Sequence, residues 1–187
     1  MIKKIKIISL VIIIVSLFII FYIELTQKYD VVVQNRIIDD VFNYDVSDNH
    51  LESHYVLYSR DDIDYLGYIY IPRFNIKRLI KYGTDNSILN DGYVGIHSLS
   101  GELEDNDLII LAGHNVSNVF HKLHSISIGD VVYIHTFNVQ KKYVVYDYKI
   151  VDESDSSYFG KRNNELILIT CTKHSGERLI VFLKEEL

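Results

Sequence analysis

The sequence predicts a mainly β protein, a closed or nearly closed barrel, that follows an N-terminal membrane-spanning helix. Two observations carry this expectation. Residues 7–23 contain no charged side chain. From residue 63 onward, short apolar runs alternate with polar clusters, which is typical of an all-β domain built from many short strands. A length of 187 residues suits one such domain with an accessory segment.

The apolar N-terminal stretch is preceded by Lys3, Lys4 and Lys6 and followed by Glu24. At about 1.5 Å per residue, a helix over residues 7–23 spans roughly 25 Å, close to the lower limit for crossing a bilayer. A cleavable signal peptide is the alternative, but residues 1–30 contain no Ala or Gly to form a cleavage site. We therefore expect an uncleaved anchor over residues 1–25. Its lysines predict a cytoplasmic N-terminus and an extracellular domain.

The segment over residues 26–62 divides into two parts. Apolar residues between Val31 and Phe42 recur at near-helical spacing, whereas residues 43–62 are polar and show no period. This pattern predicts a juxtamembrane helix followed by a stalk, which serves either as a lid or as a spacer. The folded domain is expected over residues 63–187.

Several apolar runs in this domain predict strands. The first ends at Pro72, the only proline, which suits an edge strand. The Gly129-Asp130 pair is a turn signal before another. The predicted strands cover residues 66–71, 108–112, 131–136, 143–150, 166–170 and 179–183. Apolar side chains at helical spacing over residues 116–123 predict one short helix.

Composition excludes two classes of protein. The formal net charge is −6, and no basic stripe is present, so nucleic acid is not an expected partner. The single cysteine, Cys171, cannot form an intrachain disulfide. A lone cysteine is most often a small buried apolar residue. In an exported chain, however, an exposed lone thiol is a liability unless it has a use.

Three reactive side chains stand at the ends of predicted strands. Cys171 ends one apolar run, Arg178 opens the last one, and His114 follows Gly113 directly after another. A cysteine with a suitable histidine elsewhere in the chain is a known nucleophile pattern, although it is weak by itself. If the three strands are neighbours, the three side chains can converge at one rim of the barrel.

These residues resemble those of the sortase family, the cysteine transpeptidases of Gram-positive cell surfaces. The resemblance covers roughly residues 63–187. Residues 167–171 (Ile-Leu-Ile-Thr-Cys) match the nucleophile motif Thr-Leu-x-Thr-Cys, with Ile167 in the place of the first Thr. The histidine and arginine of the family fall on His114 and Arg178. The Cys-to-Arg spacing is short and requires a tight loop. The His-to-Cys spacing leaves little room for the extra helix of one sortase class, and the subclass stays open.

The resemblance implies a closed β-barrel of about eight strands with one or two short helices. It also implies that Cys171 attacks a peptide carbonyl, that His114 transfers protons and that Arg178 stabilises the oxyanion. Thr170 and Ala112 would lie at the substrate-binding surface. The substrate would be a surface protein with a Leu-Pro-x-Thr-Gly-like C-terminal signal, and the acceptor a cell-wall peptide amine or a pilin lysine. No cofactor and no metal is implied for the reaction.

Two weaker patterns concern metals. Carboxylates crowd two predicted loops, at Glu102, Glu104, Asp105 and Asp107 and at Asp152, Glu153 and Asp155. Such clusters can hold Ca²⁺, but a solvated acidic loop is the preferred interpretation. His121 and His124 lie near each other without a third ligand, so we expect surface or groove-lining histidines rather than a metal site.

Two other functions were weighed. An L,D-transpeptidase also uses a cysteine, but its Ser-His-Gly-Cys motif does not occur before Cys171. A non-catalytic, membrane-anchored β-barrel that only binds partners is the alternative from a different class. It predicts a thiol that is inert toward alkylating reagents.

Overall fold

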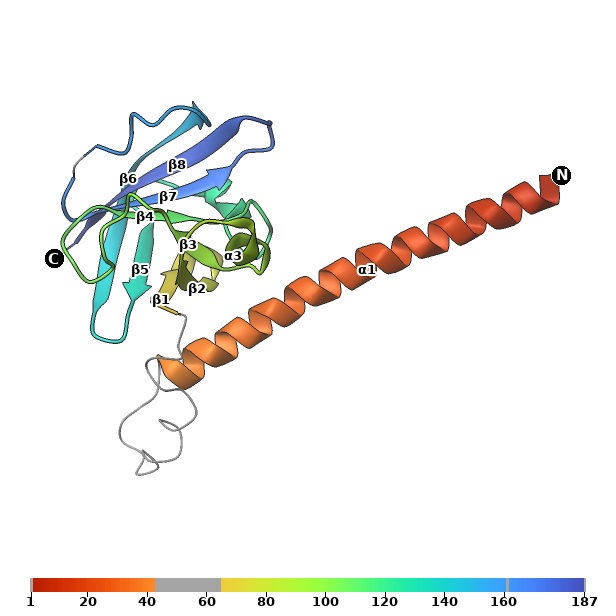
Figure 1. Ribbon diagram of the computed structural model, residues 1–187, viewed down its shortest axis with the longest axis horizontal. Helices are drawn as coiled ribbons and strands as arrows, with labels where there is room; N and C mark the ends of the chain where they lie inside the picture. Colours follow the sequence, from red (N-terminus) through yellow and green to blue (C-terminus); the bar gives the residue numbers. More distant parts are fainter. Residues whose placement is uncertain (1, 43–64, 161, 187) are drawn as a thin grey trace, which may run out of the picture.

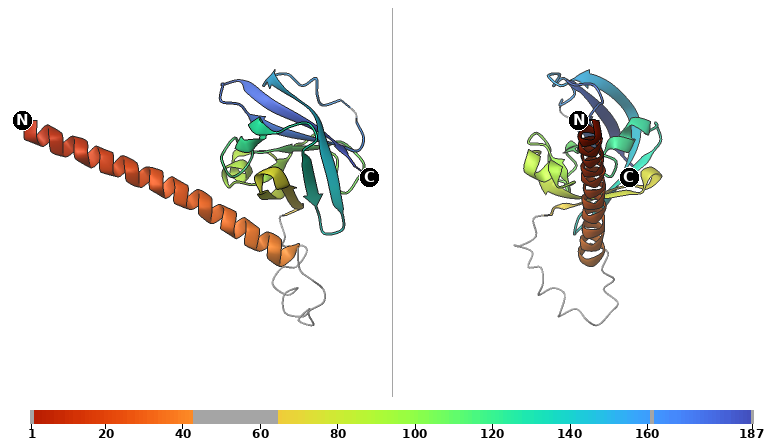
Figure 2. Two further views of the ribbon diagram at one scale, coloured as in Figure 1. Left: turned by 180° about the vertical axis from the view of Figure 1, so that it is seen from behind. Right: turned by 90° about the vertical axis from the view of Figure 1, so that its right-hand side faces the viewer.

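The computed structural model describes residues 2–42, 65–160 and 162–186. One long helix, α1 (Ile2–Val41), projects from a β-barrel and contacts it only near its C-terminal end (Figure 1). The view from behind in Figure 2 shows the same arrangement. Among the described residues, the only helix long and apolar enough to cross a membrane is this one, over Ile8–Val41.

Eight strands form the barrel, which is closed in the order β1-β2-β3-β4-β7-β8-β6-β5. The β2–β3 and β4–β7 pairs are parallel and the other pairs are antiparallel. The strands are β1 (Gly67–Ile71), β2 (Ile76–Tyr82), β3 (Val94–Ile96), β4 (Ile109–Ala112), β5 (Val131–His135), β6 (Gln140–Asp152), β7 (Glu165–Cys171) and β8 (Glu177–Glu185). The short helices are the 3-10 helix η1 (Pro72–Phe74), α3 (Asn86–Asn90) and the 3-10 helix η2 (His121–Ser125). The predicted fold class is confirmed.

The predicted elements differ from the structure in three places. The interpretation of residues 66–71 as an edge strand is wrong, because β1 pairs with both β2 and β5. Pro72 instead opens η1, where its missing N–H removes no ladder hydrogen bond. The helix expected over residues 116–123 is wrong in extent, since turns precede η2, although Val119, Phe120 and Leu123 are fully buried. β2 and β3 were not predicted individually.

Side-chain alternation separates two apolar layers in the barrel wall. On β7, Leu166 and Leu168 belong to the cluster that fills the barrel. Ile167 and Ile169 belong to a second cluster, on the outer face of the wall. Tyr158 and Phe159, from the segment between β6 and β7, are part of this outer cluster. Because the alternation has a period of two, every second residue of β7 faces this outer layer.

The C-terminal turns of α1 pack against β1 and β2. Ile38 is fully buried in a small cluster with Tyr68 and Leu79. The buried side chain of Gln34 accepts a hydrogen bond from the backbone N–H of Leu79 at 3.2 Å. Its Nε2 donates to the carbonyl oxygens of Asp91 and Gly92 at 3.3 and 3.2 Å. Residues 26–41 therefore continue the anchor helix and attach it to the barrel.

The division into residues 1–25, 26–62 and 63–187 stays a prediction. The expected stalk over residues 43–62 lies outside the described residues. Residues 63–64, at the start of the expected domain, lie outside them as well.

Candidate active site

Strand register places the three candidate residues at one end of the barrel wall. Cys171 is the last residue of β7 and is paired directly with Arg178 of β8. On the other side of β7, the parallel strand β4 pairs Ala112 with Ile169. The Gly113 N–H extends this ladder by donating to the Ile169 carbonyl at 3.0 Å. His114 and Cys171 each lie two residues beyond the paired residues Ala112 and Ile169, so both lie at the same end of the wall.

Alternation places Cys171 and Arg178 on one face of the wall. Cys171 shares the outward phase of β7 with Ile169, and Arg178 shares the outward phase of β8 with Ile180. Ala112, on β4, packs against the same outer cluster. The thiol of Cys171 is exposed, whereas Arg178 is half-buried. The strands β4, β7 and β8 run side by side in Figure 1.

His114 is held by a helix that lies far away in sequence. Its Nε2 is 3.0 Å from Oδ1 of Asn90, the last residue of α3. Gly113, which precedes it, is buried under the ring of Phe120. A Cβ at this position would lie 2.7 Å from Cδ2 of that ring, so the chain needs glycine here for close approach.

A second histidine contacts the backbone of the nucleophile candidate. His124 Nε2, on η2, lies 3.3 Å from the carbonyl oxygen of Cys171. This contact connects the segment after β4 to the end of β7. The neighbouring His121 instead lies 2.8 Å from Asn115 Oδ1 through its Nδ1.

The positive charge of Arg178 acts on the aromatic groups around it. Burial, followed by the charge of Arg178, lowers the pKa of His97. His97 Nδ1 accepts a hydrogen bond from the Leu99 N–H, and its ring stacks on Phe159 at 4.9 Å between centroids. Both contacts suit a neutral imidazole. Burial raises the pKa of Tyr158, and the charge of Arg178 opposes this rise.

Two polar atoms of the site are buried and have no hydrogen-bond partner within the described part of the chain: Arg178 Nε and Thr170 Oγ1. Buried polar groups are nearly always hydrogen-bonded, so such atoms call for an explanation. Thr170 is only 2% exposed, and it has the opposite phase to Cys171 on β7. Its hydroxyl is therefore on the barrel side of the wall, whereas Ala112 is on the outer side.

Sequence reasoning missed the supporting residues Asn90, His97 and Tyr158, and it did not predict that His124 contacts the backbone of Cys171. Asn90 ends a five-residue helix, a length that gives no periodic signal. His124 was noted, but only as one of two neighbouring histidines. Their contacts with the candidate residues span long distances in sequence, and no local pattern reveals them.

The acidic loop before β4 makes protein contacts of its own. Glu102 accepts a hydrogen bond from the Tyr82 hydroxyl at 2.9 Å, and Glu104 accepts one from the Thr136 hydroxyl at 2.7 Å. Within the described ranges, no group of three or more His, Cys, Asp or Glu side chains is arranged to hold a metal ion. The Ca²⁺ interpretation stays a prediction.

A thiol, an imidazole and a guanidinium at one end of a closed eight-stranded barrel define a candidate site for cysteine-dependent acyl transfer. The sortase domain model matches residues 69–186, and the chain belongs to the sortase family. No curated protein sequence matches the chain.

Solved sortase structures are similar to this fold. A sortase D5 transpeptidase from Clostridium perfringens is 20% identical with a TM-score of 0.64, over 87% of this chain and 99% of that chain. Sortase A of Listeria monocytogenes is 24% identical with a TM-score of 0.61, over 67% and 89%. Sortase C1 of GBS pilus island 1 is 23% identical with a TM-score of 0.61, over 66% and 65%, so this chain spans slightly less than two thirds of its length. Family membership supports a sortase-type transpeptidase.

Proposed function

We propose that the protein is a membrane-anchored cysteine transpeptidase that joins surface proteins to an amine at the cell surface. Its substrate would carry a C-terminal Leu-Pro-x-Thr-Gly-like sorting signal. The acceptor would be a cell-wall peptide amine or a pilin lysine. The observation that carries this proposal is the Cys171–Arg178 register pair with His114 at the same end of β4, in a chain that belongs to the sortase family.

In the first half of the reaction, the thiolate of Cys171 attacks the carbonyl carbon of the scissile peptide bond. A sulfur–carbon bond forms and the carbon–nitrogen bond breaks. His114, as imidazolium, gives its proton to the leaving amine. A thiolate is favoured only where positive charge lies nearby, and an imidazolium at His114 with the guanidinium of Arg178 would supply it.

In the second half, an incoming amine attacks the thioacyl carbon. His114, now neutral, accepts the proton of this amine, and the thiolate of Cys171 leaves. The new amide joins the surface protein to its acceptor. The histidine ends the cycle as imidazolium, so both halves balance without a cofactor.

Arg178 is proposed to bind the oxyanion that develops on the attacked carbonyl. Its guanidinium is permanently charged and offers several N–H donors in a fixed plane. Its Nε, which has no hydrogen-bond partner among the described residues, is consistent with a donor that a substrate carbonyl satisfies. Ala112, on the outer face, would line the substrate surface. Thr170 was expected at the substrate surface, but its hydroxyl faces the barrel side of β7, so we propose that it positions Cys171 instead of contacting the peptide.

The apolar part of α1 supports a single membrane span with a cytoplasmic N-terminus and an extracellular barrel. In this arrangement the partners are the membrane, the signal-bearing proteins and the acceptor. For the acidic loops a solvated surface stays the preferred interpretation, and loss of activity in a chelator would show Ca²⁺ dependence instead.

The test is cleavage of a library of sorting-signal peptides by the full chain in detergent micelles, with mass spectrometry of the thioacyl adduct. Cys171→Ala should abolish cleavage and adduct formation while leaving the unfolding temperature unchanged. Arg178→Lys keeps the charge but not the planar donors, and should retain only part of the activity.

His121→Gln is the matched control, since this exposed histidine forms its hydrogen bond with Asn115, whereas His124 is the one at the Cys171 carbonyl oxygen. Cleavage by the Cys171→Ala variant would refute the proposal. A wild-type thiol that alkylates no faster than a model thiol, together with no cleavage of any peptide, would favour the non-catalytic binding module.

A further inference from the structure

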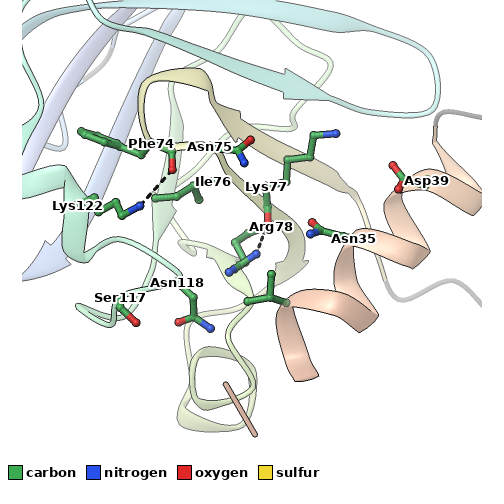
Figure 3. A pocket seen from close by; sticks show the side chains of 11 residues that line it. Asn35, Asp39, Phe74, Asn75, Ile76, Lys77, Arg78, Ser117, Asn118 and Lys122 are labelled. Carbon is green, nitrogen blue, oxygen red and sulfur yellow. Dashed lines mark hydrogen bonds between the residues drawn. The ribbon is translucent and has the colours of Figure 1, made fainter. Parts of the chain in front are cut away.

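A polar cavity of about 390 Å³ lies where the C-terminal part of α1 meets the barrel (Figure 3). Its walls come from α1, from η1 and β2, and from the segment after β4. The side chains that matter for its chemistry are Asn35, Asp39, Lys77, Arg78, Ser117 and Lys122. None of the candidate catalytic residues lines it.

The central feature of this cavity is a buried cation. Arg78 is only 3% exposed, and its guanidinium points between α1 and the Ser117–Asn118 segment (Figure 3). One of its nitrogens, Nη1, donates to the carbonyl oxygen of Lys77. Among the residues that the structure describes, no carboxylate forms an ion pair with it. Burial lowers the pKa of Arg78 to about 10, although the charge of Asp30 opposes this shift.

A buried guanidinium with no carboxylate in direct contact carries a large desolvation cost, which the charge of Asp30 offsets only in part. Several of its donors remain to be satisfied, because an arginine offers five N–H groups. Lys122 also lines the cavity, and the lining carboxylate is that of Asp39, so cations outnumber carboxylates among the lining side chains. Lys77 lines it too, but its ammonium lies over the Tyr70 ring and extends away from Arg78 (Figure 3). Lys122 Nζ contacts only the rim here, donating to the Phe74 carbonyl oxygen at 3.3 Å.

The cavity also contains an acceptor. Asn35 Oδ1 is buried and has no hydrogen-bond partner in the described ranges of the chain. Cationic donors beside a buried amide oxygen match a hydrogen phosphate group, which has several acceptor oxygens and one O–H. The planar donors of a guanidinium also fit two oxygens of a phosphate at once.

We propose that this cavity binds a phosphate-class oxyanion through Arg78 and Lys122, with Asn35 accepting from its O–H. The anion would contact both α1 and the barrel, and binding would therefore strengthen the attachment of the anchor helix. Two sources carry this chemistry. One is free phosphate or a soluble phosphate monoester, and the other is the phosphomonoester headgroup of phosphatidic acid.

The position of the cavity is compatible with both sources. Asn35 comes 11 residues after Glu24, which is roughly 16 Å along a helix. If the helix is upright, this distance places the cavity beyond the headgroup layer, which is about 5–8 Å thick per leaflet. A tilted helix would bring the cavity closer to the membrane surface.

The experiment titrates inorganic phosphate into the full chain in uncharged detergent, with sodium chloride keeping the ionic strength constant. Binding is followed by isothermal calorimetry and by the unfolding temperature. A second arm replaces phosphate with mixed micelles that contain phosphatidic acid. Saturable binding in the first arm identifies a soluble anion, and binding in the second arm alone identifies a lipid headgroup.

Three variants change the charged groups of the cavity, and a fourth is the control. Arg78→Met should weaken binding at least tenfold, and Lys122→Gln should weaken it severalfold. Asp39→Asn should tighten it severalfold. The exposed Lys184 of β8 is the matched control, and Lys184→Gln should leave affinity unchanged.

The proposal is overturned if neither arm shows saturable binding to the wild type. It is also overturned if Lys122→Gln and Asp39→Asn both bind as the wild type does. These two exposed side chains keep the test valid even if Arg78→Met does not fold.

Discussion

Replacing Gln34 with alanine is expected to destabilise the barrel and to release the anchor helix from it. In the native protein this buried side chain accepts from the Leu79 N–H and donates to the Asp91 and Gly92 carbonyls. A typical hydrogen bond contributes about 0.5–1.5 kcal/mol net. Three give roughly 1.5–4.5 kcal/mol, and because two of them share Nε2, we expect about 2–3 kcal/mol.

The measurement is urea and thermal unfolding of the full chain in detergent, followed by tyrosine fluorescence, since the chain has 15 Tyr and no Trp. For a domain of this size, about 2–3 kcal/mol corresponds to a fall in the unfolding temperature of roughly 10 °C. Hydrogen exchange at the Leu79 amide gives a local readout. This amide should exchange faster in the variant because its acceptor is gone.

Two controls separate the contributions. Gln34→Met keeps most of the packing volume and removes all three hydrogen bonds, so it should lose nearly as much stability as Gln34→Ala. Arg36→Ala changes an exposed residue of the same helix and should shift stability by at most about 0.5 kcal/mol. If Gln34→Ala is as stable as Arg36→Ala, and its Leu79 amide stays protected, the side chain does not attach α1 to the barrel.

Two further predictions concern the site and the pH dependence. Gly113→Ala would place a Cβ 2.7 Å from the buried ring of Phe120. We therefore expect the free energy of unfolding to fall by about 1–3 kcal/mol and peptide cleavage to fall because His114 is displaced. Unchanged cleavage and stability would contradict this packing argument. Burial lowers the pKa values of His97 and His135, and the nearby charges of Arg178 and Lys77, respectively, lower them further. As the pH falls, these histidines therefore take up protons in the unfolded chain at a higher pH than in the folded one. Stability should therefore be fully present above about pH 6.5 and fall toward pH 5, by at most about 1.4 kcal/mol per pH unit per histidine and less where solvent screens it. Urea unfolding across this range checks the slope, which His135→Gln should reduce; stability that rises toward pH 5 would exclude the effect.

The barrel strands that the sequence predicts well are those with continuous apolar runs. β7 and β8 are buried on both faces, because one face fills the barrel and the other meets the outer cluster around Tyr158. Such strands can be predicted from the local sequence alone, without knowing which strands pair with them. β2 is harder, since it carries Lys77, Arg78 and Lys81, and Arg78 is buried only because α1 and the segment after β4 close over it. β3 has three residues, too few for a pattern.

Sequence alone was sufficient to locate an apolar N-terminal helix, a β domain after it, and three reactive residues at strand ends. These are local properties, since apolar periodicity and strand termini depend on neighbours in the chain. Whether Cys171, His114 and Arg178 share an end and a face depends on the order of strands and on their register. Those follow from the pairing of β4 with β7 and of β7 with β8. The attachment of α1 through Gln34 and the cavity around Arg78 are also decided only in the folded state. The hydrogen-bond partners of Gln34 lie 45, 57 and 58 residues away, and the cavity walls come from three separate segments of the chain. A polar residue on a helix has no sequence signal that says which backbone groups it will meet.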